Sequence, residues 1–283
     1  MISYSYNMTL SERNVLFKTG IIFSSVCTLL MMTASFLVIS VYPGIGDAIR
    51  RPMNAFQFIA AFFLSSSYYA VHVSIAISIL FSLIGIILIH SFFERTSAPE
   101  ILYIAIFTIS LAFEVIRIIL PLHFLFNFPA YYMRAAFRVL LFVRFFSLFS
   151  LFAAGLCSAG LDVQKTRNII FVIIIASFIL TLGVPIDVLN WDASLNMVIG
   201  FSSMFRTIEI VTIFTTMISF LIAAKVRGSK DYTYIAAGTV LVLAGRDILL
   251  SADNWAGPFF GILLLSTGTW FLCSKLHKIH LWL

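Results

Sequence analysis

Eight ionisable side chains lie inside segments of the chain that are apolar enough to span a lipid bilayer. They are Glu114, Arg117, Arg138, Arg144, Arg206, Glu209, Arg246 and Asp247. An ionisable group in hydrocarbon costs roughly 2.5–3.5 kcal/mol on insertion scales, so such groups usually face a bundle interior or a wet cavity and find partners there. Carboxylates can serve as general bases, and arginines bind carboxylate or phosphate, so these eight residues form the candidate site.

The composition indicates which class of protein must position these residues. Hydrophobic residues make up 61% of the 283, charged residues make up 11%, and the mean hydropathy is +1.06. Apolar runs of about 20 residues recur along the chain, and this length crosses roughly 30 Å of hydrocarbon as a helix. We therefore predict an all-α, polytopic integral membrane bundle, with residues 1–283 forming a single transmembrane domain and no water-soluble domain of ordinary size.

We predict eight transmembrane helices along the chain. In order, they are residues 20–42, 68–93, 101–121, 136–156, 169–185, 197–224, 232–251 and 257–273. Residues 55–93 form an apolar stretch that is too long for one crossing. We therefore assign residues 43–67 to an outer interfacial or re-entrant segment, with a long tilted span as the alternative. Residues 1–19 and 274–283 are the predicted cytoplasmic N-terminal segment and tail.

The remaining positive charges predict the orientation of the bundle. With the N-terminus inside and eight crossings, both termini are cytoplasmic. The cytoplasmic side then receives Arg13, Lys18, Arg95, Lys165, Arg167, Lys225, Arg227, Lys230, Lys275 and Lys278, and the outer side receives Arg50, Arg51 and Arg134. This positive-inside asymmetry explains most of the net charge of +6 without a nucleic-acid partner. Together with the compactness of the chain, it favours a bacterial inner membrane.

The predicted topology places the candidate residues at similar depths. A rise of about 1.5 Å per residue puts all eight in the outer half of the membrane or near its middle. Glu114 and Arg117 are three positions apart, as are Arg206 and Glu209, so each pair shares a helix face. Arg144 lies some 120° around its helix from Arg138, at about 100° per residue, and we expect it to have a different partner.

The candidate residues carry more positive than negative charge. Five arginines face the three acids Glu114, Glu209 and Asp247, an excess of two positive charges. Arginine at every basic position suits planar, bidentate contacts with carboxylate or phosphate. We therefore predict an outward-facing pocket, lined by the third, fourth, sixth and seventh spans, that binds an anionic small molecule or lipid headgroup. The alternative is a set of ion pairs that holds four helices in register, with surplus arginines reaching lipid phosphates.

Three functional classes fit such a pocket. A receptor or sensory module with a separate cytoplasmic protein partner is preferred, because its short cytoplasmic loops are free to touch one. A transporter or export subunit should continue the polar groups through the inner half, where the eight residues do not lie. An intramembrane lipid-modifying enzyme could use Glu114, Glu209 or Asp247 as a base, but the sequence contains no HExxH or GxSxG motif.

The sequence offers little support for metals or cofactors. The three cysteines, Cys27, Cys157 and Cys273, have no close spacing, and His277 and His280 lack an acidic or cysteine companion. We expect no metal, no cofactor and no nucleic acid, and membrane lipids as partners. Gly257 and Gly261, four residues apart, predict close packing of the last helix.

Overall fold

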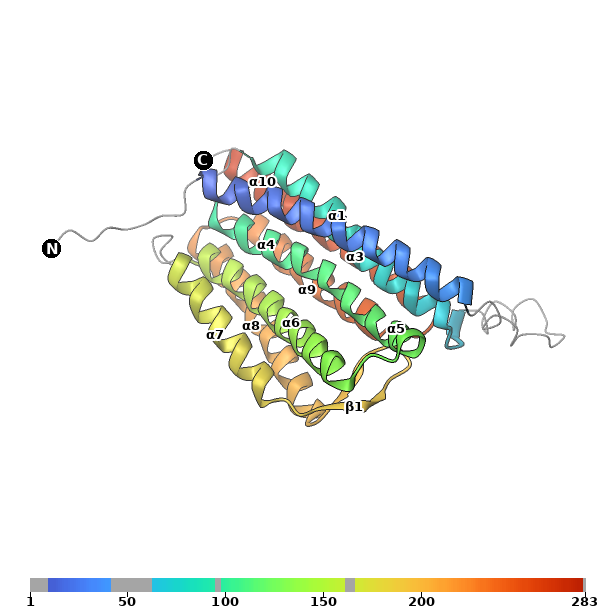
Figure 1. The fold of residues 1–283 in the computed structure, drawn as a ribbon. Coiled ribbons are helices and arrows are strands. Elements are labelled where there is room, and N and C mark those ends of the chain that lie inside the picture. The colour runs from blue at the N-terminus through green and yellow to red at the C-terminus, as the bar shows by residue number, and fades with distance from the viewer. Residues whose placement is uncertain (1–9, 42–62, 95–97, 161–165, 282–283) are drawn as a thin grey trace.

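Helices dominate the computed structural model of the chain, which describes residues 10–41, 63–94, 98–160 and 166–281 (Figure 1). The α-helices are α1 (Leu10–Val41), α3 (Tyr68–Phe93), α4 (Pro99–Ser110), α5 (Ile119–Phe126), α6 (Ala130–Ser158), α7 (Thr166–Gly183), α8 (Ser202–Val226), α9 (Asp231–Ser251) and α10 (Ala256–Leu281). The 3₁₀ helix η1 (Leu111–Ile118) joins α4 to α5, and the strands β1 (Ile186–Trp191) and β2 (Met197–Ile199) form an antiparallel hairpin.

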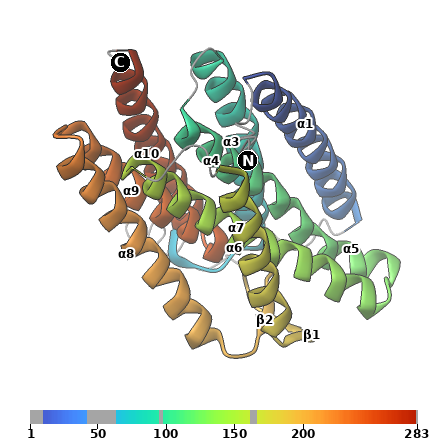
Figure 2. The ribbon, with the colours of Figure 1, turned by 90° about the vertical axis from the view of Figure 1, so that its left-hand side faces the viewer.

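The long helices lie side by side and run the length of one elongated bundle (Figures 1 and 2). α1 begins and α10 ends at the same end of the bundle, which we call the termini end. The β1–β2 hairpin and α5 lie at the opposite end, which we call the hairpin end (Figure 1). Side chains at the start of α6 and α8 and at the end of α9 are therefore brought to the hairpin end.

Seven helices within the described ranges are long and apolar enough to cross a membrane. The fifth predicted span corresponds to α7, whose apolar part is shorter, Asn168–Gly183, and which packs against α6. Large apolar side chains point away from the bundle, including Ile22 and Phe36 on α1, Phe171 on α7 and Trp270 on α10. A surface of this kind suits lipid rather than water. The chain therefore has the features of a multi-pass integral membrane protein.

The centre of the bundle is α4. Of its 12 residues, all but Pro99 and Ile109 are buried, because α3 and α6 pack against it. A helix that is apolar on every side belongs in the interior of a bundle. The continuation of α4 through η1 carries Glu114 and Arg117 to the hairpin end along this buried axis.

Glycines let α9 and α10 pack backbone to backbone. A Cβ atom at Gly268 would lie 2.7 Å from the carbonyl oxygen of Gly238, and one at Gly245 would lie 2.6 Å from the backbone nitrogen of Leu265. Gly261 takes part in this contact, as its spacing predicted, since its Cβ would lie 3.3 Å from the carbonyl oxygen of Gly245. Small residues allow this close approach in membrane helices.

Several predicted boundaries were wrong. The sixth predicted span, 197–224, starts with β2, and its helix begins only at Ser202, because Phe201 before it adopts a left-handed conformation with φ 54°. α1 begins at Leu10 rather than at residue 20. Most of the predicted segment 43–67 lies outside the described residues, but at its end the Ser67 amide donates to the carbonyl of Asp253, at 2.7 Å.

Candidate functional site

The 3₁₀ helix η1 aligns the first two candidate residues, Glu114 and Arg117. Residues three apart eclipse one another in a 3₁₀ helix, which has three residues per turn. Arg117 Nη1 accordingly lies 3.7 Å from Glu114 Oε2. The two residues are 0% and 2% exposed, respectively, so the pair is withdrawn from solvent.

Arg144 on α6 is the main partner of Glu114. Its Nε donates to Glu114 Oε1 at 2.9 Å, and its Nη2 donates to Oε2 at 2.7 Å. A two-pronged contact between guanidinium and carboxylate is stronger and more directional than a neutral hydrogen bond. As expected from its angular position, Arg144 has a partner that Arg138 does not share. The pair fastens the central helix to α6.

The turn of the hairpin lies over these charges and is bonded to them. Asn196 Oδ1 accepts a hydrogen bond from Arg144 Nη2 at 2.8 Å, and its Nδ2 donates to the carbonyl of Leu250 at 3.0 Å. Arg117 donates to the carbonyl of Ser194. The turn is therefore tied to η1, α6 and the end of α9.

Asp192 organises the turn itself. Its Oδ1 accepts hydrogen bonds from the amide and hydroxyl of Ser194, at 3.1 and 2.8 Å, and from the amide of Asn196, at 2.8 Å. A short acidic side chain that bonds backbone amides a few residues ahead stabilises such turns. The same side chain places a carboxylate close to the candidate arginines.

α9 adds a neighbouring ion pair. Arg246, which is 1% exposed, donates to Asp247 Oδ1 at 3.1 Å and to the backbone carbonyl of Arg144 at 3.3 Å. Arg246 therefore lies behind Asp247 and joins α9 to α6.

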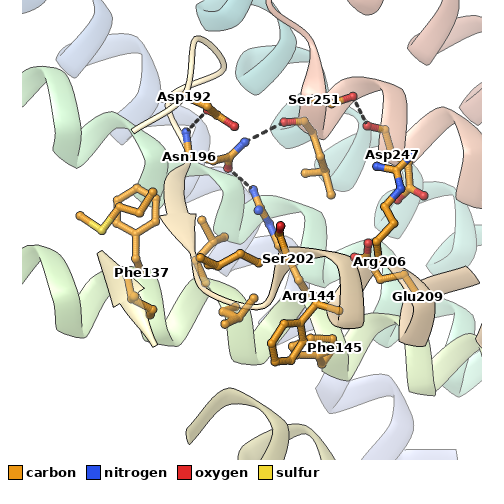
Figure 3. A pocket seen from close by; sticks show the side chains of 17 residues that line it. Phe137, Arg144, Phe145, Asp192, Asn196, Ser202, Arg206, Glu209, Asp247 and Ser251 are labelled. Atoms are coloured by element: carbon orange, nitrogen blue, oxygen red, sulfur yellow. Dashed lines mark hydrogen bonds between the residues drawn. The ribbon is translucent and has the colours of Figure 1, made fainter. Parts of the chain in front are cut away.

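These elements surround a cavity of about 270 Å³ at the hairpin end. Figure 3 shows side chains from α6, the hairpin, α8 and α9 around it. The polar lining residues are Arg144, Asp192, Asn196, Ser202, Arg206, Glu209, Asp247 and Ser251, and the apolar ones include Phe137, Phe145 and Phe205. One water needs roughly 10–15 Å³ of such volume, so the cavity is large enough to hold several waters.

The cavity brings together seven of the eight predicted residues. Arg144, Arg206, Glu209 and Asp247 line it, and the remaining three, Glu114, Arg117 and Arg246, lie behind its wall in contact with lining or turn residues. Arg138 is the exception. It is not among the lining residues and makes no ion pair in the described part of the chain, and six positions separate it from Arg144, some 120° around the helix at about 100° per residue.

Hairpin residues were missing from the predicted site. The stretch from Asp192 to Asn196 lies between two short apolar runs and is rich in turn residues, a pattern typical of a hairpin. With Asp192 included and Arg138 left out, the site has four acids and four arginines. They are Glu114, Asp192, Glu209 and Asp247, and Arg117, Arg144, Arg206 and Arg246. The predicted excess of two positive charges is therefore absent.

A second buried ionic contact lies at the termini end, and its acid, Glu100, is not among the predicted site residues. Glu100, in the first turn of α4, is 2% exposed and lies 3.6 Å from Arg227 Nη2. Arg227 also donates to the hydroxyl of Tyr232 at 2.9 Å. This contact joins α4 to the α8–α9 turn and is separate from the cavity.

The fold and the cavity define a multi-pass helical membrane protein with a polar cavity under a β-hairpin at one end. No protein-family model and no solved structure matches the chain. The chain is similar to a protein of Treponema pallidum (strain Nichols) described as uncharacterized, with 22% identity in an alignment 241 residues long that covers 67% of this chain and 69% of that protein. The function must therefore be argued from the cavity.

Proposed function

We propose that the chain is a receptor or sensory membrane module whose cavity binds a small molecule or lipid headgroup through an anionic group. The observation that carries the proposal is the unpaired guanidinium of Arg206. Its guanidinium lines the cavity and makes no hydrogen bond or ion pair with any residue in the described ranges. A guanidinium offers a planar fork of donors that matches a carboxylate or phosphate.

The cavity faces outward in the orientation we propose. α1 starts and α10 ends at the same end of the bundle, as an even number of crossings requires, with α7 as the eighth (Figure 1). That end carries Lys225, Lys230, Lys275 and Lys278 on the ends of α8, α9 and α10. Positive charge concentrates on the cytoplasmic side of membrane proteins. The hairpin end, with the cavity, then lies on the outer side.

A receptor is favoured over a transporter by the core beneath the cavity. Between η1 and the Glu100–Arg227 contact, the central helix and α6 meet through buried apolar side chains, among them Phe107, Leu148 and Leu151. The buried hydroxyls of Thr108 and Ser150 in this core donate to carbonyls of their own helices. Polar side chains usually mark the path of a substrate or ion through a membrane protein. A conformational change on ligand binding would then be transmitted to a separate protein through the cytoplasmic turns. The treponemal relative supports a bacterial membrane as the location.

Arg206→Gln is expected to remove the ligand while leaving the fold intact, because Arg206 is exposed and makes no hydrogen bond or ion pair with the described residues. Hydrogen bonds to charged groups contribute about 1.5–3 kcal/mol, so retention of an anionic ligand should fall at least tenfold. The measurement is mass spectrometry of the small molecules and lipids retained by the purified protein.

The matched control is Arg134→Gln, which removes the same charge at the same end of the bundle but outside the cavity. It should retain the ligand at the level of the unsubstituted protein. Equal retention by both variants and the unsubstituted protein would overturn the proposal.

A further inference from the structure

We infer that the ligand of this cavity is a zwitterion, with an ammonium group joined by a few bonds to a phosphate, as in an ethanolamine phosphate headgroup. The inference rests on the proposed function and adds the cationic half of the ligand. It follows from the charges that remain in the cavity after its internal ion pairs are counted.

Two of the charged lining residues are already neutralised. Arg144 is paired with Glu114 at 2.7 Å, and Asp247 is paired with Arg246 at 3.1 Å. A third, Asp192, accepts hydrogen bonds from its own turn, and its carboxylate interacts electrostatically with Arg117 and Arg144. These groups therefore contribute shape and hydrogen bonding more than net charge.

The two charges that remain are opposite in sign and lie on one helix. Arg206 and Glu209 both line the cavity, and neither makes an ion pair with any described residue, including the other. Residues three apart on an α-helix share a face and commonly bridge to each other. Here both side chains line one cavity without pairing with each other (Figure 3).

A purely anionic ligand would satisfy only one of these groups. It would pair with Arg206 but leave Glu209 without an ion-pair partner among the described residues, and it would add negative charge to a site whose four acids already balance its four arginines. A zwitterion pairs with both groups and leaves the net charge of the site unchanged. Charge complementarity of this kind gives binding sites their specificity.

The direction of α8 sets the orientation of the ligand. Arg206 is nearer to the start of α8 at the hairpin end, and Glu209 lies about 4.5 Å deeper along the helix axis. The phosphate would therefore lie toward the opening and the ammonium deeper. Phe145 and Phe205, whose ring centroids are 5.7 Å apart, also line the cavity. Aromatic faces attract ammonium groups.

The cavity also limits the size of the ligand. A volume of about 270 Å³ accommodates a headgroup but not a complete lipid. Phe201 and Met204, beside the lining residues Ser202 and Phe205, are exposed apolar side chains and could contact acyl chains. A free zwitterion and the headgroup of a lipid share the recognised chemistry, and the experiment separates them.

The test compares phosphoethanolamine with glycerol phosphate, which has the anion without the ammonium. Binding to the purified full-length protein is measured by calorimetry, and binding of phosphatidylethanolamine and phosphatidylglycerol is measured by native mass spectrometry. We expect a preference of about tenfold or more for the ethanolamine compounds. Binding of phosphatidylethanolamine alone identifies a lipid headgroup as the ligand, and binding of free phosphoethanolamine identifies a soluble one.

Two variants separate this inference from the proposed function. Glu209→Gln should abolish the preference but keep binding of glycerol phosphate, whereas Arg206→Gln should lose both ligands. If the unsubstituted protein binds both kinds of compound equally and Arg206→Gln binds neither, the proposed function stands and the zwitterion is wrong. If Arg206→Gln changes nothing, or if no compound binds, both are overturned. Glu94→Gln, at an exposed carboxylate remote from the cavity, is the control for charge removal.

Discussion

Glu114→Gln is expected to lower the free energy of unfolding by about 3–5 kcal/mol, the cost of breaking a buried ion pair from one side. The amide is the same size as the carboxylate but carries no charge. Arg144 would lose its charged partner and keep at most one hydrogen bond, to the amide oxygen, and Arg117, which is 0% exposed, would lose the carboxylate beside it. The measurement is unfolding of the purified protein by heat or by a denaturing detergent.

A control and a second substitution make this expectation specific. Glu94→Gln, at an exposed position at the end of α3, should change stability by no more than about 0.5 kcal/mol. Adding Arg144→Met to Glu114→Gln should recover part of the loss, because it removes one of the two unpaired guanidiniums. A Glu114→Gln protein as stable as the unsubstituted one would show that the pair does not hold the bundle together.

Gly268→Val should destabilise the protein by about 1–3 kcal/mol or more, the usual cost of overpacking. The new Cβ would lie 2.7 Å from both the carbonyl oxygen of Gly238 and the backbone nitrogen of Val242. Backbone atoms within helices cannot move aside as side chains can, so α9 and α10 would have to separate. The same unfolding measurement detects the loss.

The matched control for the contact between α9 and α10 is Gly183→Val. Gly183 lies at the end of α7, and no atom lies within 4 Å of a Cβ placed there. Its substitution should therefore have a small effect. Equal losses for the two glycines would mean that the valine side chain itself, and not the contact between α9 and α10, is responsible.

The helices were predictable because hydrophobic length dictates them, and the exceptions have local causes. The run from Met197 onward is apolar without interruption as far as Ile199, so composition alone joined it to the following helix. Pairing of Ile199 with Ile186 makes it a strand instead. Such backbone pairing leaves no hydrophobic periodicity of its own over three residues.

The positions of the candidate residues along their helices were predictable, but the helix faces on which they lie did not all fit one site. Because the rise per residue is constant along a helix, residue positions alone predicted that side chains of α6, α8 and α9 lie at one end of the bundle. The 120° between Arg138 and Arg144 already indicated that they could not share a partner. Arg138 was nevertheless included in the site, and the structure places it elsewhere.

Two features of the site depend on conformations that hydrophobic length alone does not reveal. The 3₁₀ geometry of η1 places Glu114 and Arg117 on one line, yet the segment reads as part of an ordinary apolar helix. The carboxylate of Asp192 enters the site only because its own turn folds back over α6. This turn changed the charge balance, and with it the expected chemistry of the ligand.

Labelling from outside tests the proposed outward-facing cavity most directly. In a protein whose native cysteines are replaced by alanine, Ser202→Cys and Ser251→Cys introduce thiols on its lining, and Ser78→Cys introduces one in the buried part of α3. A membrane-impermeant maleimide added to intact cells should label the first two and not the third. Labelling of Ser202→Cys and Ser251→Cys only after the membrane is permeabilised, or no more than that of Ser78→Cys, would contradict an outward-facing cavity.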